Sequence, residues 1–254
     1  MHPNKPRPIM LSPRVVDIEK YVIQAGSVTV KELSDRFSVS LETIRRDLQE
    51  LESNGSIKRV HGGAISLDNA DAGLAFNKRK HERSIEKKLI AYKALTLIKP
   101  GDMIMLDASS TCWYLAEALP DISLTVITNS FRNVLSLAVK KNIKTIAIGG
   151  EYSEKYAAFV GSIASGNISQ YRVDTLFLSC SAYSTTSGIW ENNEINASTK
   201  KVMLVSAKQK VLLADSHKEN RSGIVRICQF NELDIILTEK QESNVRQLNR
   251  YNKK

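Results

Sequence analysis

Short apolar runs alternate with helical stretches along most of this chain, and this alternation limits its fold more than any other feature. The apolar runs cover residues 103–106, 124–128, 145–148, 175–179, 211–214 and 235–237. The helical stretches lie near residues 84–98, 110–119, 131–141, 162–170 and 194–207. Such alternation predicts an α/β domain with a doubly wound, mainly parallel sheet that helices cover on both faces.

A different pattern precedes this region. Apolar residues at helical spacing predict one helix from Ser12 to Gly26 and a second over residues 29–37. A polar turn at residues 38–40 leads to a third helix, which ends near Ser53. Residues 56–60 and 64–66 then predict two short strands around a glycine turn. This order of elements is typical of a winged helix-turn-helix, which binds DNA.

The predicted domains follow from these patterns. Residues 67–83 lose apolar periodicity and are small, polar and basic, as expected of a linker. The DNA-binding domain is therefore predicted to cover residues 1–66. A second domain, for effector binding and oligomerisation, is predicted over residues 84–254.

Charge and cysteine usage narrow the classes of partner. The net charge of +9 favours a polyanionic partner such as nucleic acid, although basicity alone also fits a membrane surface. Cys112, Cys180 and Cys228 are far apart, which argues against disulfides or a zinc site and favours a reducing cytoplasm. No stretch is apolar enough for a signal peptide or membrane span, so we expect a cytoplasmic protein.

The third helix is the main candidate for DNA contacts, because burial of Ile44 on one face leaves its polar face exposed. A pair of arginines on a lone helix is usually only a solvated face, but the surrounding pattern favours the DNA interpretation. Base contacts are expected from Thr43, Arg45 and Arg46. Backbone or minor-groove contacts are expected from Lys58, Arg59 and His61, and phosphate contacts from Ser27, Thr29 and Ser40.

Polar residues at the ends of the predicted strands suggest a ligand site. Asp107, Ser109, Ser110 and Thr111 follow a strand and open a helix, where hydroxyls and helix N-terminal amides can bind a phosphate. An ordinary N-cap cluster is an equally good interpretation of these residues alone. Further polar or glycine positions at the same predicted edge favour the anion site; they are Thr128, Asn129, Ser130, Gly149 and Gly150.

Lys200, Asp215 and Lys218 form a third group, since lysine can neutralise a phosphate and aspartate can bind sugar hydroxyls. With 36 lysines and arginines in the chain, a surface position is the commoner interpretation of any one of them. The four histidines show neither metal spacing nor a nucleophile partner, and no nucleotide-binding glycine loop is present. We therefore predict no catalytic residue, no metal and no cofactor.

Residues 29–65, TVKELSDRFSVSLETIRRDLQELESNGSIKRVHGGAI, resemble the DNA-binding domain of the DeoR family of bacterial sugar-operon regulators. The segments DASST, ITNS, GG and LLADSHK, with the position of Lys200, extend the resemblance to about residue 240. It implies a C-terminal domain similar to ribose-5-phosphate isomerase and glucosamine-phosphate deaminase that senses phosphorylated sugars. It also implies that the strand-end residues, Lys200, Asp215 and Lys218 line the effector pocket.

The sequence departs from that family in three places. Ser109 replaces a common glycine, residues 182–184 replace a Gly-Ile-Asp run, and Asn196 stands where glutamate is frequent. DASSTCWYLA, the following LPDI, Asn196 and Cys180 are most similar to the branch of L-fucose operon activators. This resemblance implies an effector related to fuculose phosphate.

Three hypotheses follow for the function. The first is a homo-oligomer, dimer or tetramer, that binds double-stranded operator DNA under control of a phosphorylated sugar and is nucleoid-associated when bound. The second is a sugar-phosphate isomerase or deaminase with a DNA-binding appendage, which Asn196 disfavours because it removes a possible general base. The third, an RNA-binding or architectural protein, requires basic stripes with interleaved aromatic residues, which the sequence lacks.

Overall fold

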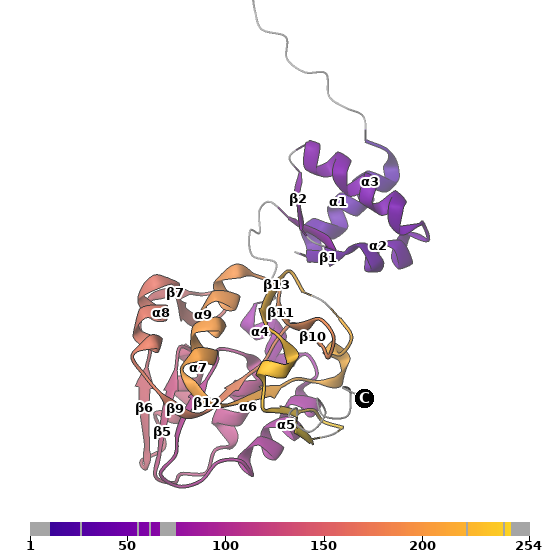
Figure 1. Cartoon of the computed structure of the whole chain (residues 1–254). Helices are drawn as coiled ribbons and strands as arrows, with labels where there is room; N and C mark the ends of the chain where they lie inside the picture. The colour runs from indigo at the N-terminus through magenta and orange to yellow at the C-terminus, as the bar shows by residue number, and fades with distance from the viewer. Residues whose placement is uncertain are drawn as a thin grey trace, which may run out of the picture. The chain divides into compact units, whose positions relative to one another are not determined.

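The computed structural model describes residues 11–25, 27–54, 56–60, 62–66, 75–221, 223–240 and 242–244. The chain divides into two compact units, with the division between Gly73 and Leu74 (Figure 1). Each unit has its own hydrophobic core.

The first unit confirms the predicted winged helix-turn-helix. Its helices are α1 (Pro13–Ala25), α2 (Val30–Phe37) and α3 (Leu41–Ser53). Its strands β1 (Ser27–Thr29), β2 (Ile57–Val60) and β3 (Gly63–Ser66) form an antiparallel sheet in the order β1-β3-β2. The sequence analysis assigned residues 27 and 28 to neither helix and predicted no strand there. Their backbone pairs with Ile65 and Ala64 and extends the sheet by a strand.

Local side-chain bonds set the tight turn between α2 and α3. Thr29 and Glu32 form a reciprocal capping box at the start of α2. Ser38 ends that helix in the left-handed conformation, with φ 53°, and the Ser40 hydroxyl accepts from Thr43 N to cap α3. The turn brings α2 and α3 together over a core that includes the buried residues Ile18, Leu33, Ile44, Leu48 and Leu51.

A seven-stranded sheet forms the centre of the second unit, in the order β15-β14-β12-β9-β4-β5-β6. The strands are β4 (Met103–Leu106), β5 (Leu124–Thr128), β6 (Ile143–Ala147), β9 (Val173–Leu178), β12 (Ala207–Leu213), β14 (Ile235–Leu237) and β15 (Glu242–Asn244). All neighbouring pairs are parallel except β14 with β15. The six predicted strands thus all lie in one sheet.

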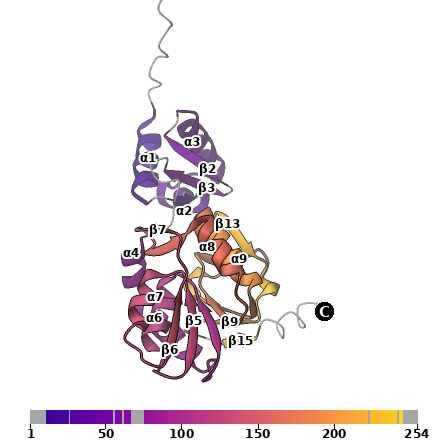
Figure 2. The same ribbon diagram turned by 90° about the vertical axis from the view of Figure 1, so that its left-hand side faces the viewer.

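Helices cover both faces of this sheet, as the doubly wound prediction requires (Figure 2). Helices α5 (Ser84–Leu95), α6 (Ser110–Ala118) and α7 (Phe131–Leu137) supply residues to the core on one face. Helices α8 (Gly161–Ser169) and α9 (Glu194–Val205) supply residues to the core on the other. Each face therefore buries its own apolar layer.

The second half of the predicted linker is wrong, because residues 76–81 form helix α4 (Phe76–His81). Phe76 is 3% exposed and packs edge-on against Trp113, with ring centroids 6.2 Å apart. Its backbone N–H also donates to the carbonyl of Lys155. One aromatic residue in a polar, basic segment produced no periodic signal, although its burial attaches the segment to the second unit.

Smaller elements were also absent from the prediction. They are the hairpin of β7 (Glu151–Ser153) and β8 (Ala158–Val160), the sheet of β10 (Ala182–Ser184), β11 (Gly188–Glu191) and β13 (Val225–Cys228), and the short helices η1 (Ser216–Lys218) and η2 (Phe230–Glu232). Three- or four-residue strands are too short to show an alternating pattern. They matter because β11 and η1 each supply a charged side chain to the site described below.

The strand order reverses direction at β4. From β4 the chain proceeds to β5 and β6 on one side, whereas β9, β12 and β14 lie on the other. Ligands of open parallel sheets bind at such a switch point, outside the carboxyl ends of the strands. In this fold, that position is where Leu106 ends β4 and Leu178 ends β9.

Candidate functional site

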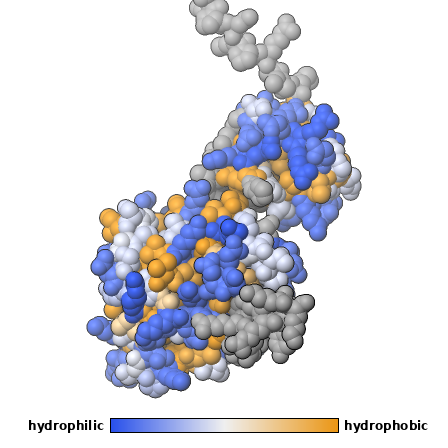
Figure 3. Space-filling model, in the orientation of Figure 1, coloured by the Kyte–Doolittle hydropathy of each residue, from blue (hydrophilic) through white to orange (hydrophobic). Residues whose placement is uncertain are grey.

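One face of α3 is buried and the opposite face is exposed. Ile44, Leu48 and Leu51 are at most 1% exposed, whereas Arg45 and Arg46 lie on the solvent face. Hydrophilic residues cover most of the first unit's surface that is visible in Figure 3. The geometry therefore leaves both guanidinium groups accessible to a ligand.

The two arginines differ in their contacts. Arg45 Nη1 lies 3.2 Å from Glu42 Oε2, one turn earlier. Arg46 makes no hydrogen bond or ion pair with any residue that the structure describes. Thr43 is half-buried, and its hydroxyl lies 2.9 Å from that of Ser40. Arg46 is thus the arginine whose donors all remain available for an external acceptor.

The other predicted DNA-contacting residues have mixed positions. Lys58 on β2 is exposed, whereas Arg59 is half-buried and its backbone N–H donates to Glu52. Thr29 is half-buried within its capping box, and Ser27 lies on β1. His61 lies outside the described residues.

Two residues that sequence reasoning missed lie on α3. Leu41, its first residue, is 44% exposed and presents an apolar side chain beside the polar face. Asp47 is 6% exposed and accepts two hydrogen bonds from Arg14 of α1, which orients α3 against α1. An apolar first residue and an acidic residue among buried positions were the available signals.

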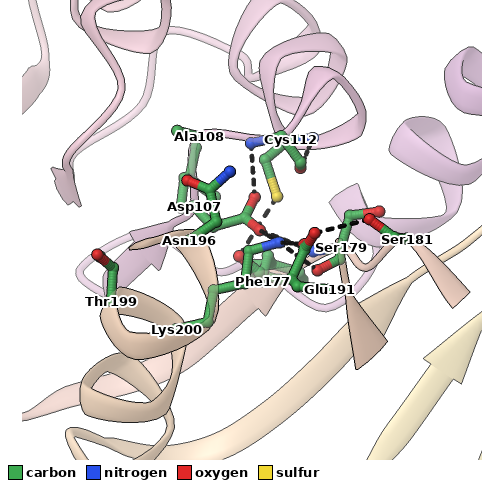
Figure 4. A network of polar contacts seen from close by, with 12 residues as sticks. Asp107, Ala108, Cys112, Phe177, Ser179, Ser181, Glu191, Asn196, Thr199 and Lys200 are labelled. Atoms are coloured by element: carbon green, nitrogen blue, oxygen red, sulfur yellow. Dashed lines mark hydrogen bonds and ion pairs between the residues drawn. The ribbon is translucent and has the colours of Figure 1, made fainter. Parts of the chain in front are cut away.

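In the second unit, Asp107, Glu191 and Lys200 form a buried network at the switch point (Figure 4). Lys200 extends from α9, and its Nζ lies 3.1 Å from Asp107 Oδ2 and donates to the carbonyl of Ser179 at 2.7 Å. Glu191 of β11 accepts from the same ammonium group. Figure 4 also shows Asn196, one turn before Lys200, beside Asp107. We use the name switch-point site for Asp107, Ser109, Ser110, Thr111, Ser179, Glu191, Lys200, Asp215 and Lys218.

The network keeps Asp107 and Lys200 ionised. Burial opposes ionisation of Asp107, but Lys200 and the N–H groups of Ser109 and Ser179 outweigh it and keep its pKa below the ordinary value. Burial likewise opposes the charge on Lys200, yet Glu191 and Asp107 raise its pKa. Asp107 and Lys200 therefore neutralise each other, and they are less available to a ligand than the sequence suggested.

The residues that open α6 divide into two roles. The Ser109 hydroxyl accepts from Cys112 N and so caps the helix, as the alternative interpretation of this cluster expected. Ser110 and Thr111, the first two helical residues, are 4% and 1% exposed. The Thr111 hydroxyl is buried without a hydrogen-bond partner. An unpaired hydroxyl beside helix N-terminal amides provides donors for an anion.

At the end of β5, most of the polar side chains bond to neighbouring parts of the fold. The Thr128 hydroxyl donates to the carbonyl of Leu106, and the Ser130 hydroxyl caps α7. Asn129 donates to the carbonyl of Phe159, which leaves its buried Oδ1 without a partner. Asn133, which sequence reasoning missed, donates to Asp107 O and to Thr128 and links β4, β5 and α7.

Two further residues of the switch-point site come from η1 and from the end of β12. They are Lys218 and Asp215. Lys218 Nζ donates to the Ser179 hydroxyl at 3.2 Å and lies 3.5 Å from Asp215 Oδ2. Asp215 Oδ1 lies 3.9 Å from Arg83 Nε and has no hydrogen-bond partner. The structure therefore brings Lys200 and Lys218 together through Ser179, a residue that the sequence analysis placed only at a strand end.

Gly149 and Gly150 lie farther along the sheet, after the edge strand β6. Gly150 has φ 154°, and a Cβ there would lie 2.8 Å from the carbonyl oxygen of Val160. The need for glycine at this position is thus explained by its approach to β8. Two strands, β5 and β4, separate β6 from β9.

In the described part of the chain, no group of three or more His, Cys, Asp or Glu side chains is arranged to hold a metal ion. None of the helices in the same ranges combines the length and apolarity needed to span a bilayer.

Two family models match the chain. Residues 14–70 match the DeoR-like helix-turn-helix domain, and residues 82–240 match the DeoR C terminal sensor domain. Together they cover both units.

Similar proteins come from several bacteria. The chain is 40% identical to the uncharacterized HTH-type transcriptional regulator YulB of Bacillus subtilis, over 91% of this chain and 90% of that protein. It is 40% identical to the L-fucose operon activator of Haemophilus influenzae, over 88% of this chain and 90% of that protein. A solved structure, ribose 5-phosphate isomerase A of Methanocaldococcus jannaschii, is 19% identical, with a TM-score of 0.39 over 52% of this chain and 53% of that one.

Proposed function

The chain belongs to the DeoR family of transcriptional regulators, and from this premise we propose that it regulates a carbohydrate-utilisation operon in response to a phosphorylated sugar. The first unit binds the operator and the second binds the effector. We place the protein in the bacterial cytoplasm, at the nucleoid when it is bound to DNA.

The exposed face of α3 is the single observation that carries the DNA-binding part. A recognition helix contacts base edges in the major groove through side chains near its N-terminus. Arg46 lies there without a partner among the described residues, and Arg45 is paired only with exposed Glu42. An exposed ion pair of this kind contributes little and is easily exchanged for a base or phosphate contact. Lys58 on β2 adds a further exposed cation.

A phosphorylated effector is supported by the polar groups at the switch-point site. The helix N-terminus of α6, the unpaired Thr111 hydroxyl and Lys218 are all suited to an anion. Asp215 and Asn129 each have a buried oxygen without a hydrogen-bond partner, and such oxygens can accept from sugar hydroxyls. Relatedness to an L-fucose operon activator favours a 6-deoxyhexose phosphate such as fuculose phosphate.

An isomerase or deaminase activity is less well supported. Such chemistry needs a carboxylate or similar base that can exchange protons with substrate. Asp107 and Glu191 are both paired with Lys200, and Asn196 cannot act as a carboxylate base. We therefore propose that the site binds its ligand without turning it over.

We also propose that the protein acts as a homo-oligomer, dimer or tetramer. Winged helices generally bind paired half-sites, which a symmetric oligomer matches. On α5, Ile85, Leu89 and Tyr92 recur at helical spacing and are 73%, 48% and 63% exposed. Side chains of this kind favour a contact with a second copy. Light scattering of Leu89→Glu against wild type tests it: reduced mass supports this contact, and unchanged mass rejects it.

The central test combines selection and competition. The wild-type protein selects an operator duplex from a randomised pool, and a gel shift then measures its affinity with and without sugar phosphates. The proposal is supported if a sugar phosphate stabilises the protein and its unphosphorylated parent sugar does not. The same sugar phosphate should also change the affinity for the operator. Failure to select any duplex at low salt, or stabilisation by unphosphorylated sugars alone, contradicts it.

A further inference from the structure

Leu41, the first residue of α3, is an apolar residue on the surface of the first unit. Its side chain is 44% exposed, whereas Ile44 and Leu48 of the same helix are at most 1% exposed. The hydrophobic core of the first unit includes Ile44 and Leu48 but not Leu41. Packing within the unit therefore does not explain an apolar side chain at this position.

The residues around Leu41 on α3 are polar. Ser40 precedes it and caps the helix, and Glu42 follows it with its side chain 73% exposed. Arg45, one turn later along the helix surface, is also exposed. An apolar surface for a protein partner is usually a contiguous patch, and one leucine among charged side chains does not form such a patch. Leu41 is instead suited to a small apolar group on an otherwise polar ligand.

The major groove of DNA contains a group of this kind. Base pairs expose hydrogen-bond donors and acceptors there, and thymine adds a C5-methyl group that proteins recognise by apolar contact. A recognition helix enters the groove with its N-terminal residues against the base edges. Because Leu41 is the first residue of α3, this binding mode places its side chain at the base edges.

Most polar groups in the first turn of α3 are already engaged. The Thr43 hydroxyl lies 2.9 Å from that of Ser40, which also accepts from Thr43 N. Glu42 Oε2 lies 3.2 Å from Arg45 Nη1. The exposed side chain of Leu41 makes no such contact and is free to approach a base.

We propose that Leu41 makes the operator require thymine at one position in each half-site, through contact between its side chain and the C5-methyl group. This inference rests on the proposed binding of the operator by α3. Cytosine, the other pyrimidine of DNA, has no methyl group at C5 and cannot make the same contact. Leu41 thus reads the operator by apolar contact, whereas Arg45 and Arg46 supply hydrogen bonds.

Replacement of thymine by deoxyuridine tests the contact, because deoxyuridine lacks only the C5-methyl group and keeps every hydrogen-bonding group. The probe is the duplex that the wild-type protein selects from a randomised pool, with its thymines replaced one at a time. At one thymine in each half-site, the replacement should weaken wild-type binding about fourfold, as expected for the loss of one buried methyl group. Fluorescence anisotropy of the full-length protein with each duplex gives the affinities.

Leu41→Ala removes the same contact from the protein side. It should bind the thymine duplex at least about threefold more weakly than wild type does, and deoxyuridine should then weaken its binding less than about twofold. Leu41→Gln, which replaces the apolar end of the side chain by an amide, should behave alike and decides the question if the alanine variant does not fold. Leu41→Met keeps an apolar side chain of similar size and should retain most of the wild-type response to deoxyuridine.

Ile23→Ala is the matched control, because Ile23 is an apolar residue of α1 with a similar exposure, 45%. It should respond to deoxyuridine as wild type does. If Leu41→Ala, or Leu41→Gln in its place, responds as this control does at every thymine, the inference fails while operator binding stands. The same conclusion follows if wild type tolerates every replacement. If wild type selects no duplex at low salt, the proposed DNA binding fails and the inference fails with it.

Discussion

Lys200 and Asp107 form an ion pair across the sheet, with Nζ 3.1 Å from Oδ2 and with side chains only 9% and 1% exposed. Lys200 belongs to α9 on one face, whereas Asp107 precedes α6 on the other. Glu191 accepts from the same ammonium and attaches the β10–β11 hairpin. Together, these three side chains hold the start of α6, the β10–β11 hairpin and α9 at the switch point.

Removal of one member should destabilise the second unit strongly. Lys200→Met leaves two buried carboxylates without their cation, and we expect a loss of about 3–5 kcal/mol in the free energy of unfolding. Both tryptophans, Trp113 and Trp190, lie in the second unit, so urea unfolding followed by tryptophan fluorescence reports on it. Lys201→Met, at an exposed neighbouring position, is the control. A loss no larger than that of the control would show that the network is dispensable.

Acid should weaken the same network. The folded-state pKa of Asp107 lies below its ordinary value of 3.8, so the folded protein binds this proton less tightly than the unfolded chain. Its contribution to stability is complete above the ordinary pKa and is lost as pH falls through the lower folded-state pKa. The unfolding free energies of wild type and Asp107→Asn should thus differ by a constant amount at neutral pH and converge below about pH 4. Parallel curves down to pH 3 would contradict this cause.

Residues at strand ends could be predicted from the sequence because parallel strands bring their carboxyl ends to one edge. Asp107, Thr128 and Asp215 each follow a run of apolar residues, and the structure places all three at that edge. The third helix was equally predictable, since Ser40, Ile44 and Asn54 supply its cap, buried face and end.

Other parts of the site gave no local signal. Glu191 reaches Lys200 because β11 pairs with the short strands β10 and β13, and strands of three or four residues show no periodicity in a sequence. Arg79 and Lys87 lie in or beside a basic segment that resembled a linker. The contact of Arg79 with Ala108 depends on α4, which buried Phe76 attaches to the second unit. The sequence also does not show which charged side chains pair with each other. It therefore gave no sign that Asp107 and Lys200 neutralise each other.

Ser109 allows the two interpretations of its cluster to be separated. As the N-cap of α6, its replacement by alanine should cost about 0.5–2 kcal/mol, whereas glycine should cost only a few tenths. Thermal unfolding of Ser109→Ala and Ser109→Gly measures this difference. Ser109→Gly should keep the affinity for sugar phosphates. A large loss of ligand affinity with unchanged stability would instead identify the hydroxyl as a ligand contact.

Arg46 should contribute more to operator specificity than other exposed cations of the first unit. If its free guanidinium forms a bidentate contact with a base, Arg46→Ala should weaken binding by about 1–3 kcal/mol, roughly fivefold to more than hundredfold. Fluorescence anisotropy with the selected duplex gives the affinities. Lys20→Ala, at an exposed residue of α1 paired with Asp17, should stay within about twofold of wild type. Equal losses in the two variants would exclude a specific role for Arg46.

Because the ammonium of Lys87 is buried, the protein should take up protons when the effector binds near pH 9. With a pKa lowered to about 8, Lys87 is mostly neutral at pH 9 in the folded protein without ligand, whereas the unfolded chain keeps that proton up to its ordinary pKa of 10.5. The contribution of Lys87 to the free energy of unfolding therefore increases as pH rises from about 8 to 10.5. Lys87 interacts electrostatically with Asp215 and Lys218 of the switch-point site. A dianion bound at that site should therefore favour the charged form and raise the pKa of Lys87, so the protein should take up part of a proton when the sugar phosphate binds at pH 9. The phosphate itself is fully ionised there and contributes no proton.

Calorimetry in buffers of different ionisation enthalpy measures this uptake directly. Lys87→Met should abolish it, whereas Lys99→Met, at an exposed lysine before β4, should preserve it. At pH 6.5, where Lys87 is charged with or without ligand, this lysine should contribute no difference between the two variants. Equal uptake in both variants at pH 9 would mean that Lys87 does not respond to the bound anion.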